Sequence, residues 1–223
     1  KFLKKYSKKI IYIKVNDLPN IKLKGKKDYG ILKVQMENIF RGLKNANDND
    51  LIIFSDEDEI PNPERIKVFN KEKFKFGIFL QNMYYFKFNI QNFDEGKGNW
   101  PGSRICKKKY LKSFFKLRLL KTKNINYPFW RFDKEKNIQL IKKGGWHFTY
   151  LMSPKDISKK IKSMSHTEFN KKNFTNVKNI KTKITNLEDP FDRNFNLKKV
   201  SIDQSYPSYI RNNLNLFKKW ILK

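Results

Sequence analysis

Residues 51–63, LIIFSDEDEIPNP, place four consecutive carboxylates directly after a short apolar run. A four-residue apolar run between turn residues is typical of a buried strand, so we predict a strand over 51–54. Along an extended backbone, side chains two residues apart share a face, which would put Asp56 and Asp58 on one side. Carboxylates this close repel each other unless a cation lies between them, and oxygen ligands favour Mg2+ or Mn2+.

The same acids have a plainer interpretation. They would also suit a solvated acidic turn that caps the helix predicted to begin at Pro63-Glu64. In open α/β sheets, however, ligands bind at the carboxyl ends of the strands, which is where these acids fall. Spacing alone does not choose between a metal- or diphosphate-binding site and an acidic turn.

The composition indicates one folded domain over residues 1–223. Hydrophobic residues make up 39% of the chain and aromatic residues 15%, which argues against a disordered protein. No apolar run reaches the roughly 18 residues of a membrane span, and the lysine-rich first ten residues do not form a signal peptide. The single cysteine, Cys106, excludes an intramolecular disulfide, so we expect a protein of the reducing cytoplasm.

The formal net charge of +29 has two explanations. A basic protein can bind nucleic acid or an anionic membrane. Lysine nevertheless supplies 43 of the 50 positive side chains, whereas arginine is preferred for phosphate and base recognition. Lys, Asn, Ile and Phe, all abundant here, share A/T-rich codons, so codon bias explains them together. We therefore expect no nucleic-acid partner, while the Lys-rich faces would suit peripheral contact with an anionic membrane.

Periodicity predicts a strand at 8–15, an amphipathic helix at 31–46 and then the strand at 51–54. This β-α-β order favours an α/β fold with a mostly parallel central sheet flanked by helices. Further expectations are strands within 74–90 (interrupted at Gly77, with a second strand at 83–88) and at 138–141, a loop at 92–104, and helices at 64–69, 107–121, 154–163, 168–177 and near the C-terminus.

The two histidines lie in unusual settings. His147 follows Gly144-Gly145-Trp146, and glycines permit close backbone approach to a ligand. His166 follows Ser165 and precedes Glu168. A lone histidine is more often an ordinary core or surface residue than a ligand, so the pattern makes His147 the stronger candidate of the two.

Three segments resemble glycosyltransferase family 17: residues 55–61 (SDEDEIP), 144–151 (GGWHFTYL) and 160–168 (KIKSMSHTE). They stand in the family's order, and the resemblance extends over nearly the whole chain. The best-known members are β-1,4-mannosyl-glycoprotein 4-β-N-acetylglucosaminyltransferases, which add a bisecting N-acetylglucosamine to N-glycans. The resemblance implies a GT-A-like, inverting transferase that uses UDP-GlcNAc as donor and a hydroxyl of a glycan, polysaccharide or glycolipid as acceptor.

The resemblance also implies site residues. Asp56-Glu57-Asp58 matches an Asp-x-Asp motif, in which Asp56 and Asp58 would hold Mn2+ or Mg2+ against the donor's two phosphates. By analogy of architecture, His147 would be a further metal or diphosphate contact, and Trp146 beside it a donor contact.

Inverting transfer also needs a carboxylate that takes the acceptor's proton. Glu59 and Glu168 are the candidates, and the sequence does not decide between them. Trp100 and Trp146 would suit stacking on a sugar or uracil, although burial in the core explains them equally well.

Family members carry a segment ahead of the predicted strand at 8–15. The resemblance therefore leads us to expect a chain that is truncated at its N-terminus and lacks the first β-α units. Two alternatives to an active transferase stay open: a basic protein that binds nucleic acid or an anionic surface, and an inactive fragment.

Overall fold

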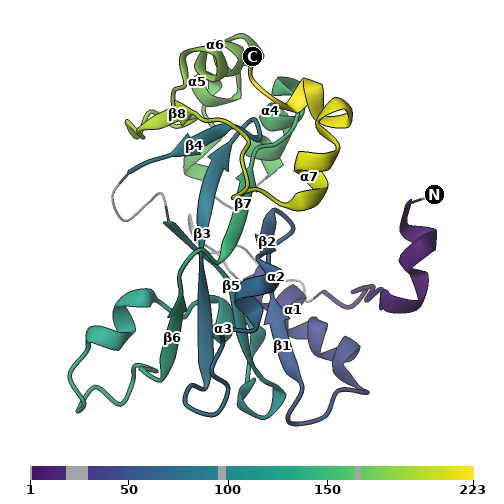
Figure 1. Cartoon of the computed structure of the whole chain (residues 1–223), viewed down its shortest axis with the longest axis vertical. Coiled ribbons are helices and arrows are strands. Elements are labelled where there is room, and N and C mark those ends of the chain that lie inside the picture. The colour runs from purple at the N-terminus through teal and green to yellow at the C-terminus, as the bar shows by residue number, and fades with distance from the viewer. Residues whose placement is uncertain (1, 19–29, 95–98, 164–166) are drawn as a thin grey trace.

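A single eight-stranded sheet forms the centre of the protein in the computed structural model, which describes residues 2–18, 30–94, 99–163 and 167–223 (Figure 1). The strands are β1 (Leu51–Phe54), β2 (Glu59–Pro61), β3 (Phe76–Tyr85), β4 (Ile90–Asn92), β5 (Asn99–Lys107), β6 (Ile138–Ile141), β7 (Gly145–Thr149) and β8 (Leu197–Lys199).

Short helices surround this sheet. The α-helices are α1 (Gly30–Glu37), α2 (Pro63–Ile66), α3 (Phe114–Arg118), α4 (Pro154–Ser163), α5 (Lys172–Thr175), α6 (Val177–Asn186) and α7 (Ser208–Asn212). The 3-10 helices are η1 (Phe2–Lys9), η2 (Asn38–Leu43), η3 (Lys108–Tyr110), η4 (Thr122–Asn126), η5 (Thr167–Phe169) and η6 (Leu214–Trp220). None of the described helices combines the length and the apolar character that crossing a membrane requires.

The central strand is β3, and the sheet is mixed, with mostly antiparallel pairs. Strand β3 pairs with β4 and β5 antiparallel and with β6 and β7 parallel, while the β1–β5, β2–β7 and β4–β8 pairs are all antiparallel. The prediction of an α/β protein is confirmed, but the prediction of a mostly parallel sheet is wrong. The β-α-β argument failed because its first strand does not exist and because β1 pairs with β5 rather than with a parallel neighbour.

The expected strand at 8–15 is instead the end of η1 followed by irregular chain. Its Ile11 and Tyr12 side chains are 67% and 82% exposed, so β-favouring residues here have no sheet to bury them. The helix expected at 31–46 is present as α1 and η2, and the strand at 51–54 is confirmed as β1.

The loop expected at 92–104 is also wrong, because β5 begins at Asn99. Gly102, which suggested a loop, is required by packing: a Cβ there would lie 1.8 Å from Oε1 of Gln81 on β3. Strand β3 likewise runs unbroken through Gly77 and Met83, so the interruption and the second strand predicted for 74–90 do not occur.

Prediction was better for the other elements. The strand at 138–141 and the helix at 154–163 are confirmed as β6 and α4. The helix expected at 64–69 is the shorter α2; that at 107–121 is reduced to α3; that at 168–177 is divided between η5 and α5; and the C-terminal helix is α7 with η6.

The two faces of the sheet carry different apolar clusters. On one face, Met83 and Tyr85 of β3 pack with Ile157 and Ile161 of α4 and with α6. On the other, Tyr84 packs with Phe148 of β7 and with α7. Helices α4–α6 gather at one end of the sheet, with β4 and β8, while α1 and α3 lie toward the opposite end near β1 (Figure 1).

Candidate functional site

The acidic stretch forms a tight turn between β1 and β2. The backbone N–H of Glu59 donates to the carbonyl of Asp56 at 3.1 Å, so the acids do not continue the strand in extended form. The argument that put Asp56 and Asp58 on one side of an extended backbone is therefore wrong. Nevertheless Asp56 and Asp58 line the same pocket, with Glu57 between them 86% exposed.

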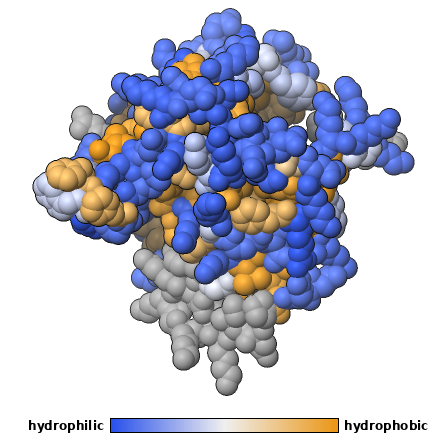
Figure 2. Space-filling model, turned by 90° about the horizontal axis from the view of Figure 1, so that it is seen from below, coloured by the Kyte–Doolittle hydropathy of each residue, from blue (hydrophilic) through white to orange (hydrophobic). Residues whose placement is uncertain are grey.

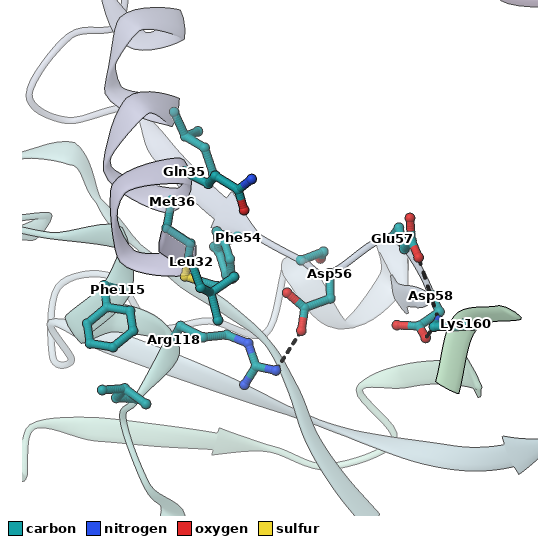
Figure 3. Close-up of a pocket in the computed structure, with 13 residues that line it drawn as sticks. Leu32, Gln35, Met36, Phe54, Asp56, Glu57, Asp58, Phe115, Arg118 and Lys160 are labelled. Carbon is teal, nitrogen blue, oxygen red and sulfur yellow. Dashed lines mark ion pairs between the residues drawn. The ribbon is translucent and has the colours of Figure 1, made fainter. Parts of the chain in front are cut away.

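This pocket has a volume of about 870 Å3 and two different walls (Figure 3). Apolar side chains from α1 and from the α3 region form one wall, among them Leu32, Met36 and Phe115. The acidic turn lies opposite, together with Arg118 of α3 and Lys160 of α4. A volume of this size falls in the range of roughly 300–1,000 Å3 that is usual for small-molecule sites.

Each aspartate faces a cation. Oδ2 of Asp56 lies 2.6 Å from Nη2 of Arg118, and Nζ of Lys160 lies 3.6 Å from both Oδ2 of Asp58 and Oε1 of Glu57 (Figure 3). The helices thus bring positive charge from two distant parts of the chain to the acidic turn. An anion with several oxygens could take the place of the carboxylates on these two cations.

Arg104 is a buried arginine close to Arg118. It is 3% exposed, and its guanidinium donates to the carbonyls of Pro101 and of Leu120, just beyond α3. Burial, and then the nearby Arg118 charge, lowers the pKa of Arg104 to about 10, so it remains a cation at neutral pH. This contact holds the end of α3 against β5.

Pairing of β2 with β7 places Glu59 directly opposite His147. Close contact of the strands depends on Gly145, whose φ is +134° and where a Cβ would lie 2.0 Å from the carbonyl oxygen of Ile60. The glycine pair predicted to permit close approach therefore does so, but to the chain's own strand β2.

Glu59 is buried at 5% exposure and has both carboxylate oxygens engaged. Oε1 accepts the indole Nε1–H of Trp100 at 2.7 Å, and Oε2 accepts the backbone N–H of Asp56 at 3.3 Å. Burial, the largest cause, raises the pKa of Glu59, while the Trp100 hydrogen bond opposes this rise. The Trp100 ring also stacks on His147, with centroids 5.0 Å apart.

His147 offers a buried nitrogen toward the acidic turn. Its Nδ1 has no hydrogen-bond partner among the described residues and lies 3.7 Å from Oδ1 of Asp58. Burial, the largest cause, lowers the pKa of His147, although the Asp58 charge opposes this. The neutral imidazole is the form that can bind a metal.

These atoms fit a divalent cation in part. Within the described ranges, no group of three or more His, Cys, Asp or Glu could hold a metal on its own. Mg2+ is commonly bound by one or two carboxylates together with substrate phosphates and water. The protein therefore does not have to supply all the ligands. Asp58 and His147 suit such an open site, although Lys160 also lies 3.6 Å from Asp58, whereas Asp56 is held more closely by Arg118 at 2.6 Å.

A smaller pocket of about 180 Å3 is lined by Trp100 and Pro101 of β5. Met83, Tyr85 and Arg193 contribute to its walls. Asn92 also lines it, is 1% exposed, and has its Oδ1 occupied by the backbone N–H of Asp94. Its Nδ2 finds no partner in the described part of the chain, so this pocket contains a buried, unused donor.

The remaining candidates lie elsewhere. Trp146 is buried on the opposite face of β7 from His147, and its Nε1–H donates to the carbonyl of Ser205 at 3.0 Å. Glu168 is half-buried on η5 and is not among the residues that line the pocket at the acidic turn. His166 falls outside the described residues.

Sequence reasoning missed Arg118, Lys160 and the role of Trp100. Arg118 lies within the helix predicted at 107–121 but was not singled out, although arginine is scarce in this chain. Lys160 lies in one of the quoted segments, but nothing in its spacing connects it with the acids at 56–58.

The comparison with protein families gives one match: the family model described as glycosyltransferase family 17 matches residues 2–196. Neither the search of curated proteins nor that of solved structures found a match.

Proposed function

The chain belongs to glycosyltransferase family 17, and on this basis we propose that it transfers N-acetylglucosamine from UDP-GlcNAc to a sugar hydroxyl with inversion at the anomeric carbon. Family membership makes it a glycosyltransferase of the N-acetylglucosaminyltransferase type. The use of a metal, the stereochemistry and the residue roles below are our proposal.

The pocket at the acidic turn carries this proposal, because it combines an apolar wall with a charged one. The wall formed by Leu32, Met36 and Phe115 suits the flat base of a nucleoside. Arg118 and Lys160 lie at the charged wall, where they would neutralise a diphosphate. As the bond to the sugar breaks, negative charge builds up on the departing UDP, and these two fixed cations would stabilise it.

Asp58 and His147 are the residues that would hold a divalent ion. When bound there, Mn2+ or Mg2+ would act as a Lewis acid toward the departing diphosphate. The motif implied that Asp56 is a metal ligand. We propose instead that its carboxylate, 2.6 Å from the Arg118 guanidinium, orients that side chain.

We assign Glu59 a positioning role. Its side chain is 1% exposed and both oxygens are engaged, which favours holding Trp100 and the Asp56 backbone over meeting the acceptor. Glu168 does not line the pocket at the acidic turn, so the acceptor would have to bring its hydroxyl near η5 for Glu168 to take the proton.

The small pocket lined by Trp100 would take one sugar ring. At about 180 Å3 it is smaller than usual drug-sized sites, which excludes a complete nucleotide sugar. The Trp100 indole provides an apolar surface for the ring, and the unused Nδ2 of Asn92 could donate to a hydroxyl or an acetamido oxygen.

Calorimetric titration of UDP-GlcNAc into the purified chain tests the proposal, first with Mn2+ and then with EDTA. We expect the wild type to bind UDP-GlcNAc more weakly in EDTA than in Mn2+. We expect Asp58→Asn to weaken this binding in Mn2+ but not in EDTA. Asp48→Asn, an exposed acid outside the pocket, is the matched control and should bind like the wild type. Absence of UDP-GlcNAc binding by a folded chain, with salt-dependent RNA binding in its place, would contradict the proposal.

A further inference from the structure

The loop at 127–132, between η4 and β6, carries three exposed aromatic side chains. Phe129 is 79% exposed, Trp130 61% and Phe132 88%. Isolated exposed apolar side chains are ordinary, but these three lie within four residues and form an apolar tip, in which the Phe129 and Trp130 ring centroids are 5.2 Å apart. Apolar side chains protrude at the left edge of Figure 2, the side on which this loop lies in Figure 1.

Polar side chains hold the loop in this shape. Nζ of Lys136 donates to the carbonyls of Pro128, Phe129 and Arg131 at 3.0, 3.1 and 2.9 Å. Arg131 in turn donates to both oxygens of Asp133 at 2.7 and 2.8 Å. The loop is therefore arranged with Lys136 bonded to its backbone, Arg131 bonded to Asp133, and its aromatic rings exposed.

The tip belongs to a projecting loop (Figure 1) in a basic stretch of the chain, in which Asp133 pairs with Arg131 and Lys134. Residues 121–136 contain five lysines or arginines and two acids, within a chain of net charge +29. A second copy of this chain would carry the same charge and would be repelled. A projection also offers no cavity in which a small ligand could be enclosed.

We propose that this loop docks the protein on an anionic lipid bilayer. The aromatic rings would enter the boundary between headgroups and acyl chains, where Trp and Phe are favoured. Lysines behind the tip would remain at the level of the anionic headgroups, where each attracts the surface. This attachment is separate from the proposed transfer reaction and does not depend on it.

Flotation with lipid vesicles tests the proposal on the complete chain. Vesicles contain phosphatidylcholine alone or phosphatidylcholine with phosphatidylglycerol. The decisive variant combines Phe129→Ser, Trp130→Ser and Phe132→Ser, which leaves the charge unchanged. Its matched control combines Ile11→Ser, Tyr12→Ser and Leu216→Ser, whose side chains are 67%, 82% and 67% exposed.

We expect the wild type and the control to float with phosphatidylglycerol vesicles and the loop variant to bind them at least about tenfold less, because apolar burial is lost. Melting temperatures should agree, since the replaced side chains are exposed. Brominated lipids should quench Trp130 fluorescence, and Trp130→Phe should remove that quenching.

Equal flotation of the loop variant and the wild type would overturn the proposal, because lysines alone would then explain the binding. The proposal would also be overturned if the wild type were a dimer that does not float and the loop variant were a monomer. The tip would then bind a second copy of the chain. Unchanged quenching in Trp130→Phe would also overturn it.

Discussion

Trp100 on β5 and Glu59 on β2 are joined by a 2.7 Å hydrogen bond from the indole Nε1–H to Oε1. The same indole stacks on His147, whose Nδ1 lies 3.7 Å from Asp58. The pair thus fixes the position of His147 beside the acidic turn.

We expect Trp100→Phe to lower the free energy of unfolding by about 1–3 kcal/mol, because it leaves a buried acceptor without its donor. In a Glu59→Gln background the same substitution should cost less, since no buried carboxylate remains. Chemical denaturation of the two single variants and the double variant measures this coupling. Additive effects would show that the hydrogen bond does not join the two residues energetically.

Arg118→Gln should weaken binding of UDP alone about tenfold, since hydrogen bonds to charged groups contribute roughly 1.5–3 kcal/mol. The titration is done in EDTA, so that any change reflects the cation and not a metal. Arg41→Gln is the control, because Arg41 pairs with Asp17 at the surface and does not line the pocket. Equal losses in the two variants would indicate a general effect of charge.

Asn92→Asp should weaken UDP-GlcNAc but not UDP if the small pocket takes the donor's sugar. The new carboxylate can still accept the Asp94 N–H, but it lacks the donating Nδ2 of asparagine. If the pocket takes the acceptor's sugar, UDP-GlcNAc binding should be unchanged and the KM for the acceptor should rise. A variant unchanged in both measurements would exclude Asn92 from the sugar site.

Gly145→Ala should destabilise the fold by roughly 2 kcal/mol or more, because its φ is +134° and the new Cβ would meet the Ile60 carbonyl at 2.0 Å. Gly42→Ala is the control, since the nearest atoms to its added Cβ are 3.9 Å away. Thermal unfolding should separate the two variants clearly. Similar melting temperatures would mean that the β2–β7 contact adjusts at little cost.

Cys106 should be unreactive toward thiol reagents in the native protein at pH 8. Burial raises the pKa of this thiol to about 12, so the reactive thiolate is absent at that pH. Unfolding exposes the group and lowers its pKa, and labelling should then be complete. Because this pKa is higher in the folded than in the unfolded chain, burial of the neutral thiol contributes to the free energy of unfolding. That contribution is lost as the pH rises toward 12. Rapid native labelling at pH 8 would contradict the burial.

Local patterns were sufficient for several elements of this protein. The apolar run at 51–54 became β1, and the helix at 154–163 became α4. Both carry signals that a few neighbouring residues supply, namely a run between turn residues and a proline at a helix start. The failures came where partners are distant: Ile11 and Tyr12 favour a strand but have no sheet, whereas Gly102 suggests a loop but fits against Gln81.

The sequence by itself determined the family, through three ordered segments, and placed Asp56 and Asp58 in a stretch after a strand. Tertiary structure alone decided that Asp56 meets Arg118, that Asp58 meets Lys160 and His147, and that Trp146 faces away. The reason is physical. Motifs record which side chains follow one another, but pairing of β2 with β7 and packing of α3 and α4 determine which charges meet across the pocket.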